Sequence, residues 1–67
     1  MKYGMMENLK MRIENFGGVI QTEKGIFILN KKQYHSLQSF SVPRVVKNPS
    51  VIFQKLLEIG AIYATEG

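Results

Sequence analysis

The pattern of apolar and polar positions is clearest in residues 19–30, where two short apolar runs flank a Glu-Lys-Gly turn. The first run, Val-Ile-Gln-Thr, is half polar, as in an edge strand. The second run, Ile-Phe-Ile-Leu, is unbroken and rich in β-branched and aromatic side chains. Gly25 can adopt a positive φ without a steric clash. The pattern predicts a β-hairpin with a short loop ending in Gly25, and a second strand buried on both faces.

Before the hairpin, apolar residues recur three or four positions apart, with charged residues between them. This spacing favours an amphipathic helix that begins near residue 5 and ends at the glycine pair 17–18. We expect residues 1–4 to form a flexible terminus. The apolar positions of the predicted helix are Met6, Leu9, Ile13 and Phe16.

After the hairpin, Asn30 and Gln33 have the spacing of a capping box, which predicts a helix from residue 31. Pro43 stops this helix, because proline restricts the residue before it to extended conformations. The side chains expected to face inward are Tyr34, Leu37 and Phe40 or Val42.

The C-terminal third predicts one more helix and a strand. Asn48 is the expected N-cap and Pro49 the first helical residue, since proline has no N–H to leave unsatisfied there. Gly60 closes the helix. Residues 44–47 suit a short strand or a loop, and residues 61–64 suit a terminal strand that could join the hairpin.

Together these elements predict a single small α+β domain over residues 1–67. Its expected order is helix, β-hairpin, helix, short strand, helix, strand. A chain of 67 residues has a small core, and without cysteine it has no disulfide to support it. Self-association as a homodimer would enlarge that core.

Composition argues against catalysis. The chain has one histidine, His35, and neither aspartate nor cysteine, so it offers no catalytic triad and no zinc site. We therefore expect no enzyme activity, no metal and no cofactor. The chain contains no apolar run near the roughly 18 residues of a membrane span, and we expect a soluble cytoplasmic protein.

Charge is concentrated in the middle of the chain, because residues 24–57 contain six lysines or arginines and no acid. A surface of one sign attracts phosphates, so the leading hypothesis is a small regulatory or accessory protein that binds nucleic acid, most simply DNA. The side chains of Gln33 and Gln38, and those of the serines at positions 36, 39, 41 and 50, would add hydrogen-bond donors. The residues expected to contact nucleic acid are Lys31, Lys32, Arg44, Lys47 and Lys55.

The alternative is a protein–protein interaction module, an inhibitor or adaptor, that docks an acidic partner. In that hypothesis the lysines meet the acidic surface. The apolar contact comes from Val42, Val45 and Val46, or from the predicted edge strand at residues 19–22.

The segment from Pro49 to Gly67, PSVIFQKLLEIGAIYATEG, resembles the last helix and first wing strand of a winged helix-turn-helix domain. Both show a leucine-rich helix, a glycine and then an apolar strand. The resemblance covers less than a third of the chain. It implies a winged-helix-like fold and DNA binding by the basic helical region.

Overall fold

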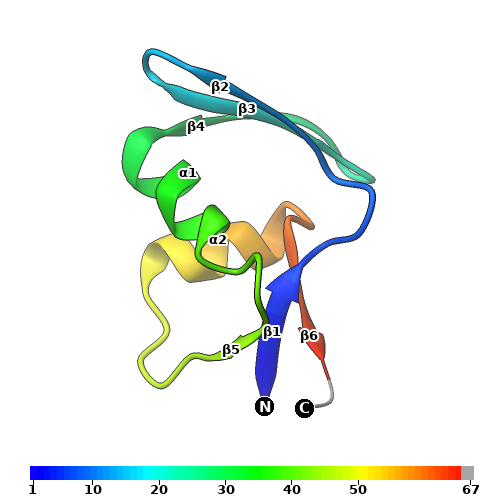
Figure 1. The fold of residues 1–67 in the computed structure, drawn as a ribbon, viewed down its shortest axis with the longest axis vertical. Coiled ribbons are helices and arrows are strands. Elements are labelled where there is room, and N and C mark those ends of the chain that lie inside the picture. The colour runs from blue at the N-terminus through cyan, green and yellow to red at the C-terminus, as the bar shows by residue number, and fades with distance from the viewer. Residues whose placement is uncertain (66–67) are drawn as a thin grey trace.

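The computed structural model describes residues 1–65 as two three-stranded antiparallel sheets with two helices between them (Figure 1). One sheet has the order β2-β3-β4 and is called here the upper sheet. The other has the order β5-β1-β6 and is called the lower sheet. The elements are β1 Lys2–Met5, β2 Lys10–Glu14, β3 Gly17–Thr22, β4 Gly25–Asn30, α1 Lys31–Gln38, β5 Arg44–Val45, α2 Val51–Glu58 and β6 Ile62–Thr65.

The predicted hairpin is present as β3 and β4. Thr22 pairs with Gly25 across a turn of Glu23 and Lys24, and Gly25 has a φ of 135°. However, β3 also pairs with β2 along its length, so residues 19–22 belong to the central strand. The prediction of an edge strand there is wrong.

The predicted fold class is also wrong, because the chain does not begin with a helix. Strands make up 42% of residues 1–65 and helices 25%. Residues 5–16 form the end of β1, a turn and β2 instead, and Asn8 in the turn has a φ of 61°, which no helix accommodates. Leu9, Met11 and Ile13 are spaced by two, the period of a strand, and this spacing prevailed over the helical one.

The lower sheet joins the two ends of the described chain. Its central strand is β1, the segment expected to be a flexible terminus, which pairs with β5 on one side and with β6 on the other. The pairing of β6 with β1 means that the C-terminal strand does not join the hairpin. The strand lies in the segment that resembles a winged helix, and its partner is the N-terminal strand rather than a wing hairpin.

Both helices have side-chain caps at their N-termini. The capping box of α1 is confirmed: the Asn30 side chain accepts a hydrogen bond from the Gln33 N–H at 2.8 Å, and Gln33 Oε1 accepts one from the Asn30 N–H at 2.9 Å. The N-cap of α2 is Ser50, whose Oγ accepts from the Phe53 N–H, so the prediction of Asn48 is wrong. A serine hydroxyl caps a helix as well as an asparagine amide does.

The predicted C-terminus of α2 at Gly60 is confirmed. Gly60 has a φ of 79°, and its N–H donates to the Leu57 carbonyl at 3.2 Å, while the Ala61 N–H donates to the Leu56 carbonyl at 2.9 Å. These two bonds form a Schellman motif, which needs a left-handed residue at the glycine position. The motif turns the chain directly into β6.

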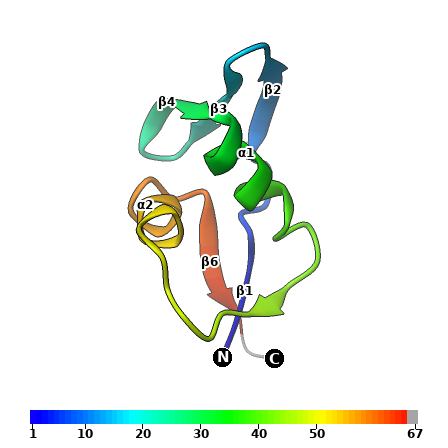
Figure 2. The same cartoon turned by 90° about the vertical axis from the view of Figure 1, so that its left-hand side faces the viewer.

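The two helices lie between the two sheets (Figure 2), and the core consists of side chains from both helices and both sheets. Side chains from β3 and β4 meet α1 above, and α2 meets the lower sheet, where the Tyr3 ring packs edge-on against Phe53 at 4.8 Å between centroids. Phe40, expected to face inward, is buried, whereas Val42 is 72% exposed. The fully buried large side chains are Ile20, Leu29, Leu37, Phe40, Leu56 and Ile62.

Two hydrogen bonds hold the hairpin turn to the end of α2. Thr22 Oγ1 donates to the Ile59 carbonyl at 2.6 Å, and Lys24 Nζ donates to the Glu58 carbonyl at 2.8 Å. Both acceptors lie at the C-terminus of α2, where carbonyls lack partners within the helix. The upper sheet is therefore fixed to the lower half of the molecule at this end. Neither helix of the described chain is long and apolar enough to cross a membrane.

Candidate binding groove between α1 and β2

A groove runs between α1 and β2 because the helix does not cover the whole inner face of the upper sheet. The helix packs over β3 and β4. By strand alternation Ile13 of β2 points to the same inner face as its neighbour Gly18, yet it is 72% exposed. The uncovered Ile13 forms one wall of the groove.

The close approach of α1 to β3 forms the inside of the groove. Tyr34 is buried and its ring lies on Gly18, where an added Cβ would overlap the ring atoms. Gly17 has a φ of 147°, and a Cβ there would overlap the backbone of Leu29 and Asn30. The glycine pair expected to end a helix therefore begins β3 and lets α1 approach the strand.

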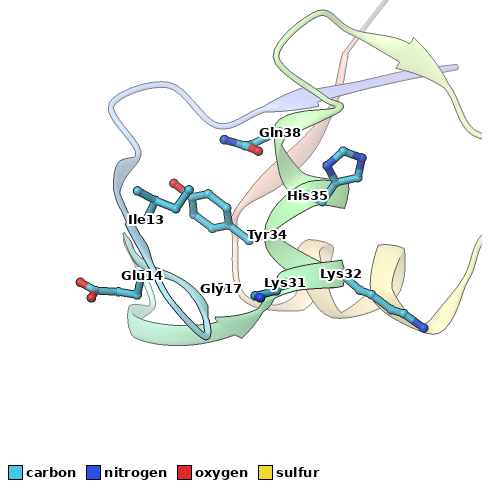
Figure 3. Close-up of a pocket in the computed structure, with 8 residues that line it drawn as sticks. All are labelled: Ile13, Glu14, Gly17, Lys31, Lys32, Tyr34, His35 and Gln38. Carbon is cyan, nitrogen blue, oxygen red and sulfur yellow. The ribbon is translucent and has the colours of Figure 1, made fainter.

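The second wall comes from one side of α1. Lys31, His35 and Gln38 are separated by four and three positions, which places them on one helical face. Figure 3 shows the Tyr34 ring extending from α1 toward Ile13 across the groove. The groove has a volume of about 460 Å³ and is lined by Ile13, Glu14, Gly17, Lys31, Lys32, Tyr34, His35 and Gln38.

The groove has a positive balance of charge. Its one acid, Glu14, is ion-paired with Arg12 of the same strand. No other ion pair forms among residues 1–65, so Lys31 and Lys32 keep unpaired charges in the first turn of α1. A cation near a helix N-terminus is locally unfavourable, because the N-terminal end of a helix carries partial positive charge. An anionic group bound in the groove would relieve that repulsion.

Acidic side chains gather at the other end of the upper sheet. Glu7 and Glu23 border the same hollow beside Thr22, whereas the groove borders Gly17. Gly17 and Thr22 are the two ends of β3, which at about 3.3 Å per residue lie roughly 17 Å apart. Lys10 and Lys24 lie at that end too, so acids and cations are mixed there, whereas Lys31 and Lys32 give the groove an excess of positive charge.

A second surface is the outer face of the upper sheet, which no helix covers. Ile26 and Ile28 of β4 are 69% and 73% exposed, so the prediction that this strand is buried on both faces is wrong. Only its inner side chains, Phe27 and Leu29, pack against the core. By alternation the outer face carries Lys10 and Arg12 of β2, Val19 and Gln21 of β3, and Ile26 and Ile28 of β4.

All five predicted nucleic-acid contacts are exposed, but only Lys31 and Lys32 line the groove. Arg44 stacks over the Phe40 ring, 4.1 Å from its centroid, and donates to Ser39 Oγ at 2.8 Å. Lys47 lies in the loop after β5, and Lys55 is in the last turn of α2. These three cations do not line the groove.

Several groove residues were not predicted as site residues. His35 follows Lys31 by four positions and was recognisable as its neighbour on the helix surface. Ile13 was not recognisable, because the apolar spacing of residues 6–16 favours a helix there and not a strand beside α1. Gln33, expected both in the capping box and as a donor to nucleic acid, is held in the capping box of α1 through its Oε1. No cluster of three or more His, Cys, Asp or Glu residues suited to a metal occurs within residues 1–65.

Comparison with family models, with curated proteins and with solved structures finds no match to this chain. Its function is therefore inferred from the groove and from the surfaces around it.

Proposed function

We propose that this protein is a small non-enzymatic protein-interaction module whose groove holds an acidic segment of a partner protein. The observation that carries the proposal is that the exposed Ile13 lines the same groove as Lys31 and Lys32, which form no ion pair within residues 1–65. A segment with an apolar side chain next to an acidic one can pack the first against Ile13 and pair the second with a lysine of α1. We also propose that it acts in the cytoplasm, since a chain without cysteine suits a reducing compartment.

The apolar part of the groove supplies an anchoring site. Interfaces derive most of their affinity from a few apolar or aromatic side chains buried in a pocket, with polar groups around them. Ile13 and the Tyr34 ring form such a pocket, and its volume of about 460 Å³ accommodates a large side chain with its flanking backbone. Gln38 and His35 offer hydrogen bonds to that backbone.

The charged part supplies orientation. Lys31 and Lys32 attract an acidic segment, whereas the other end of the sheet has no such excess of cations, because Glu7 and Glu23 lie there with Lys10 and Lys24. Such complementarity raises the rate of association and suppresses wrong partners more than it raises affinity. The apolar anchor and the cations therefore have separable roles.

Binding by a peptide tests the proposal. The probe is a fluorescein-labelled peptide repeating Glu-Glu-Leu, with repeats of Glu-Glu-Ser and Lys-Lys-Leu as matched controls, measured by fluorescence anisotropy at low salt. We expect saturable binding of Glu-Glu-Leu alone. Ile13→Ser should weaken it about tenfold, the effect of about 1.4 kcal/mol. Lys31→Gln with Lys32→Gln should reduce both affinity and its salt dependence.

The control variant for charge is Lys47→Gln, because Lys47 is exposed and does not line the groove. Its affinity for Glu-Glu-Leu should equal that of the unmodified protein. Equal binding of Glu-Glu-Leu and Glu-Glu-Ser, or equal loss on Lys47→Gln, would contradict the proposal, since either result means that charge alone attracts the peptide.

Nucleic-acid binding is a second candidate function. It is favoured by the five exposed cations Lys31, Lys32, Arg44, Lys47 and Lys55 in an acid-free stretch of sequence. Against it, the exposed large side chains near the groove and on the outer face are mainly aliphatic, whereas single-stranded nucleic acids are held by aromatic stacking. Only two of the five cations meet at one site.

Duplex DNA in the same anisotropy assay distinguishes the two functions. If DNA is the partner, affinity falls steeply with salt, and replacing Lys31, Lys32, Arg44 and Lys47 together reduces the salt slope. Ile13→Ser would then have no effect on DNA affinity. If the four substitutions leave the affinity for DNA unchanged, nucleic-acid binding by these cations is excluded.

A further inference from the structure

The free edge of β4 lacks the features that normally keep a sheet edge from pairing. The edge strand β2 carries charged residues at alternate positions, and β5 is only two residues long and follows Pro43. Charges, prolines and short length are the usual protections of an edge. In contrast β4 has six residues, GIFILN, with no charge and no proline.

The backbone of this edge is available for pairing. The two-residue turn makes Thr22 and Gly25 a hydrogen-bonded pair, so Phe27 and Leu29 also direct their backbone groups toward β3. The intervening residues Ile26 and Ile28 direct their N–H and C=O groups to the open side. Their side chains stand on the outer face at 69% and 73% exposure.

We propose that β4 pairs antiparallel with β4 of a second copy of this chain, across a two-fold axis at Phe27. In this register Ile26 of one copy lies opposite Ile28 of the other. Both residues direct their backbone groups outward, so each pair exchanges hydrogen bonds in both directions. The two upper sheets become one continuous six-stranded sheet.

The strand itself indicates a second copy as the occupant, because Ile-Phe-Ile is symmetric about Phe27. An antiparallel pair of such strands gathers four isoleucines on one outer face, where β-branched cross-strand neighbours stabilise a sheet. Each chain has a net charge of +4, yet the contact is uncharged. Lys10 and Arg12 lie on β2, two strand spacings or about 10 Å from each β4.

Dimerisation through β4 is independent of the proposed function. The groove lies between α1 and β2, and β2 is the opposite edge of the upper sheet. Both grooves of the dimer therefore stay open. A dimer would present two equivalent grooves to a partner, with the gain in avidity that two linked sites give.

Sedimentation equilibrium tests the proposal by measuring the mass of the protein in solution. The protein concentration is varied up to about 100 µM, which covers dimers with micromolar dissociation constants. One chain has a mass of 7.7 kDa, and we expect the mass of two chains at the upper concentrations. The double variant Ile26→Lys with Ile28→Lys places like charges opposite each other. It should raise the dimer dissociation constant by about tenfold or more.

A charge-pair variant controls for folding and for register. Ile26→Lys with Ile28→Glu places opposite charges across the same contact, so it should dimerise again, while circular dichroism shows both variants folded. If the unmodified protein has the mass of one chain at the highest concentration, the proposal is overturned. The free edge of β4 would then be open to pairing with a strand of another protein. Dimerisation of the double-lysine variant, or failure of the charge-pair variant to dimerise when folded, overturns this interface.

Discussion

The ring of Tyr34 lies directly on Gly18, and the space that a Cβ of residue 18 would need is occupied by the ring. This contact sets the distance between α1 and the upper sheet. It buries Tyr34, which is 7% exposed, and it positions the groove wall of α1 relative to Ile13. The stability of the domain and the shape of its groove therefore depend on the absence of a Cβ at Gly18.

Gly18→Ala should destabilise the domain by about 2 kcal/mol or more, because the added methyl forces Tyr34 out of its position. Urea denaturation measures the change in the free energy of unfolding. Gly4→Ala is the matched control, since a Cβ at residue 4 meets its nearest atom, Pro43 Cγ, at 3.4 Å. Equal losses from the two substitutions would show that the Tyr34 contact is not what requires glycine at residue 18.

Thr22→Val should cost about 1–2 kcal/mol. The substitution keeps the shape of the side chain but removes the hydroxyl that donates to the Ile59 carbonyl and accepts from the Lys24 N–H. Urea denaturation again gives the free energy of unfolding. Thr65→Val removes a longer, exposed bond of 3.3 Å to the Lys2 carbonyl and should change stability by about 0.5 kcal/mol or less. A reversed order would contradict the role of Thr22.

Ser50→Ala should destabilise the domain by about 1 kcal/mol, the usual cost of losing an N-cap. Asn48→Ala should change the free energy of unfolding by about 0.5 kcal/mol or less, because Asn48 is exposed and precedes the cap. Thermal unfolding of the two variants compares them directly. A larger loss from Asn48→Ala would restore the capping position suggested by the sequence.

Arg44→Lys should lower stability by about 0.5–1 kcal/mol while keeping the charge. Lysine has no planar guanidinium to stack on Phe40, and it cannot reproduce both bonds to Ser39 Oγ. Lys47→Gln is expected to leave the free energy of unfolding unchanged. If Arg44→Lys is neutral in urea denaturation, the stacking of Arg44 contributes nothing to the fold.

Local structure was predictable where neighbouring residues determine it. The turn before Gly25, the capping box of Asn30 and Gln33, and the termination of α2 at Gly60 each depend on residues within a few positions of one another. The residue types and their spacing within a few positions determine such caps and turns. These three features were correctly predicted.

Structure that depends on distant contacts was not predictable in the same way. Residues 5–16 satisfy both a helical and a strand spacing, and pairing with β3 decides between them. The unbroken run of β4 suggested burial on both faces, but only one face has a helix against it. The two lysines of the groove, Lys31 and Lys32, were predicted as binding residues from the charge pattern. Ile13 could not be predicted, because its position in the groove depends on the pairing of β2 with β3.

The pairing of β1 with β6 has a consequence for the order in which the protein folds. Thr65 bonds to Lys2 across 63 positions of the chain, whereas β2, β3 and β4 are joined by short turns. Contacts between distant residues form late, because a long loop must close before they stabilise anything. The upper sheet can therefore form before α2 and β6 have packed. β1 must wait for β6, more than fifty residues later in the chain, before the lower sheet can close.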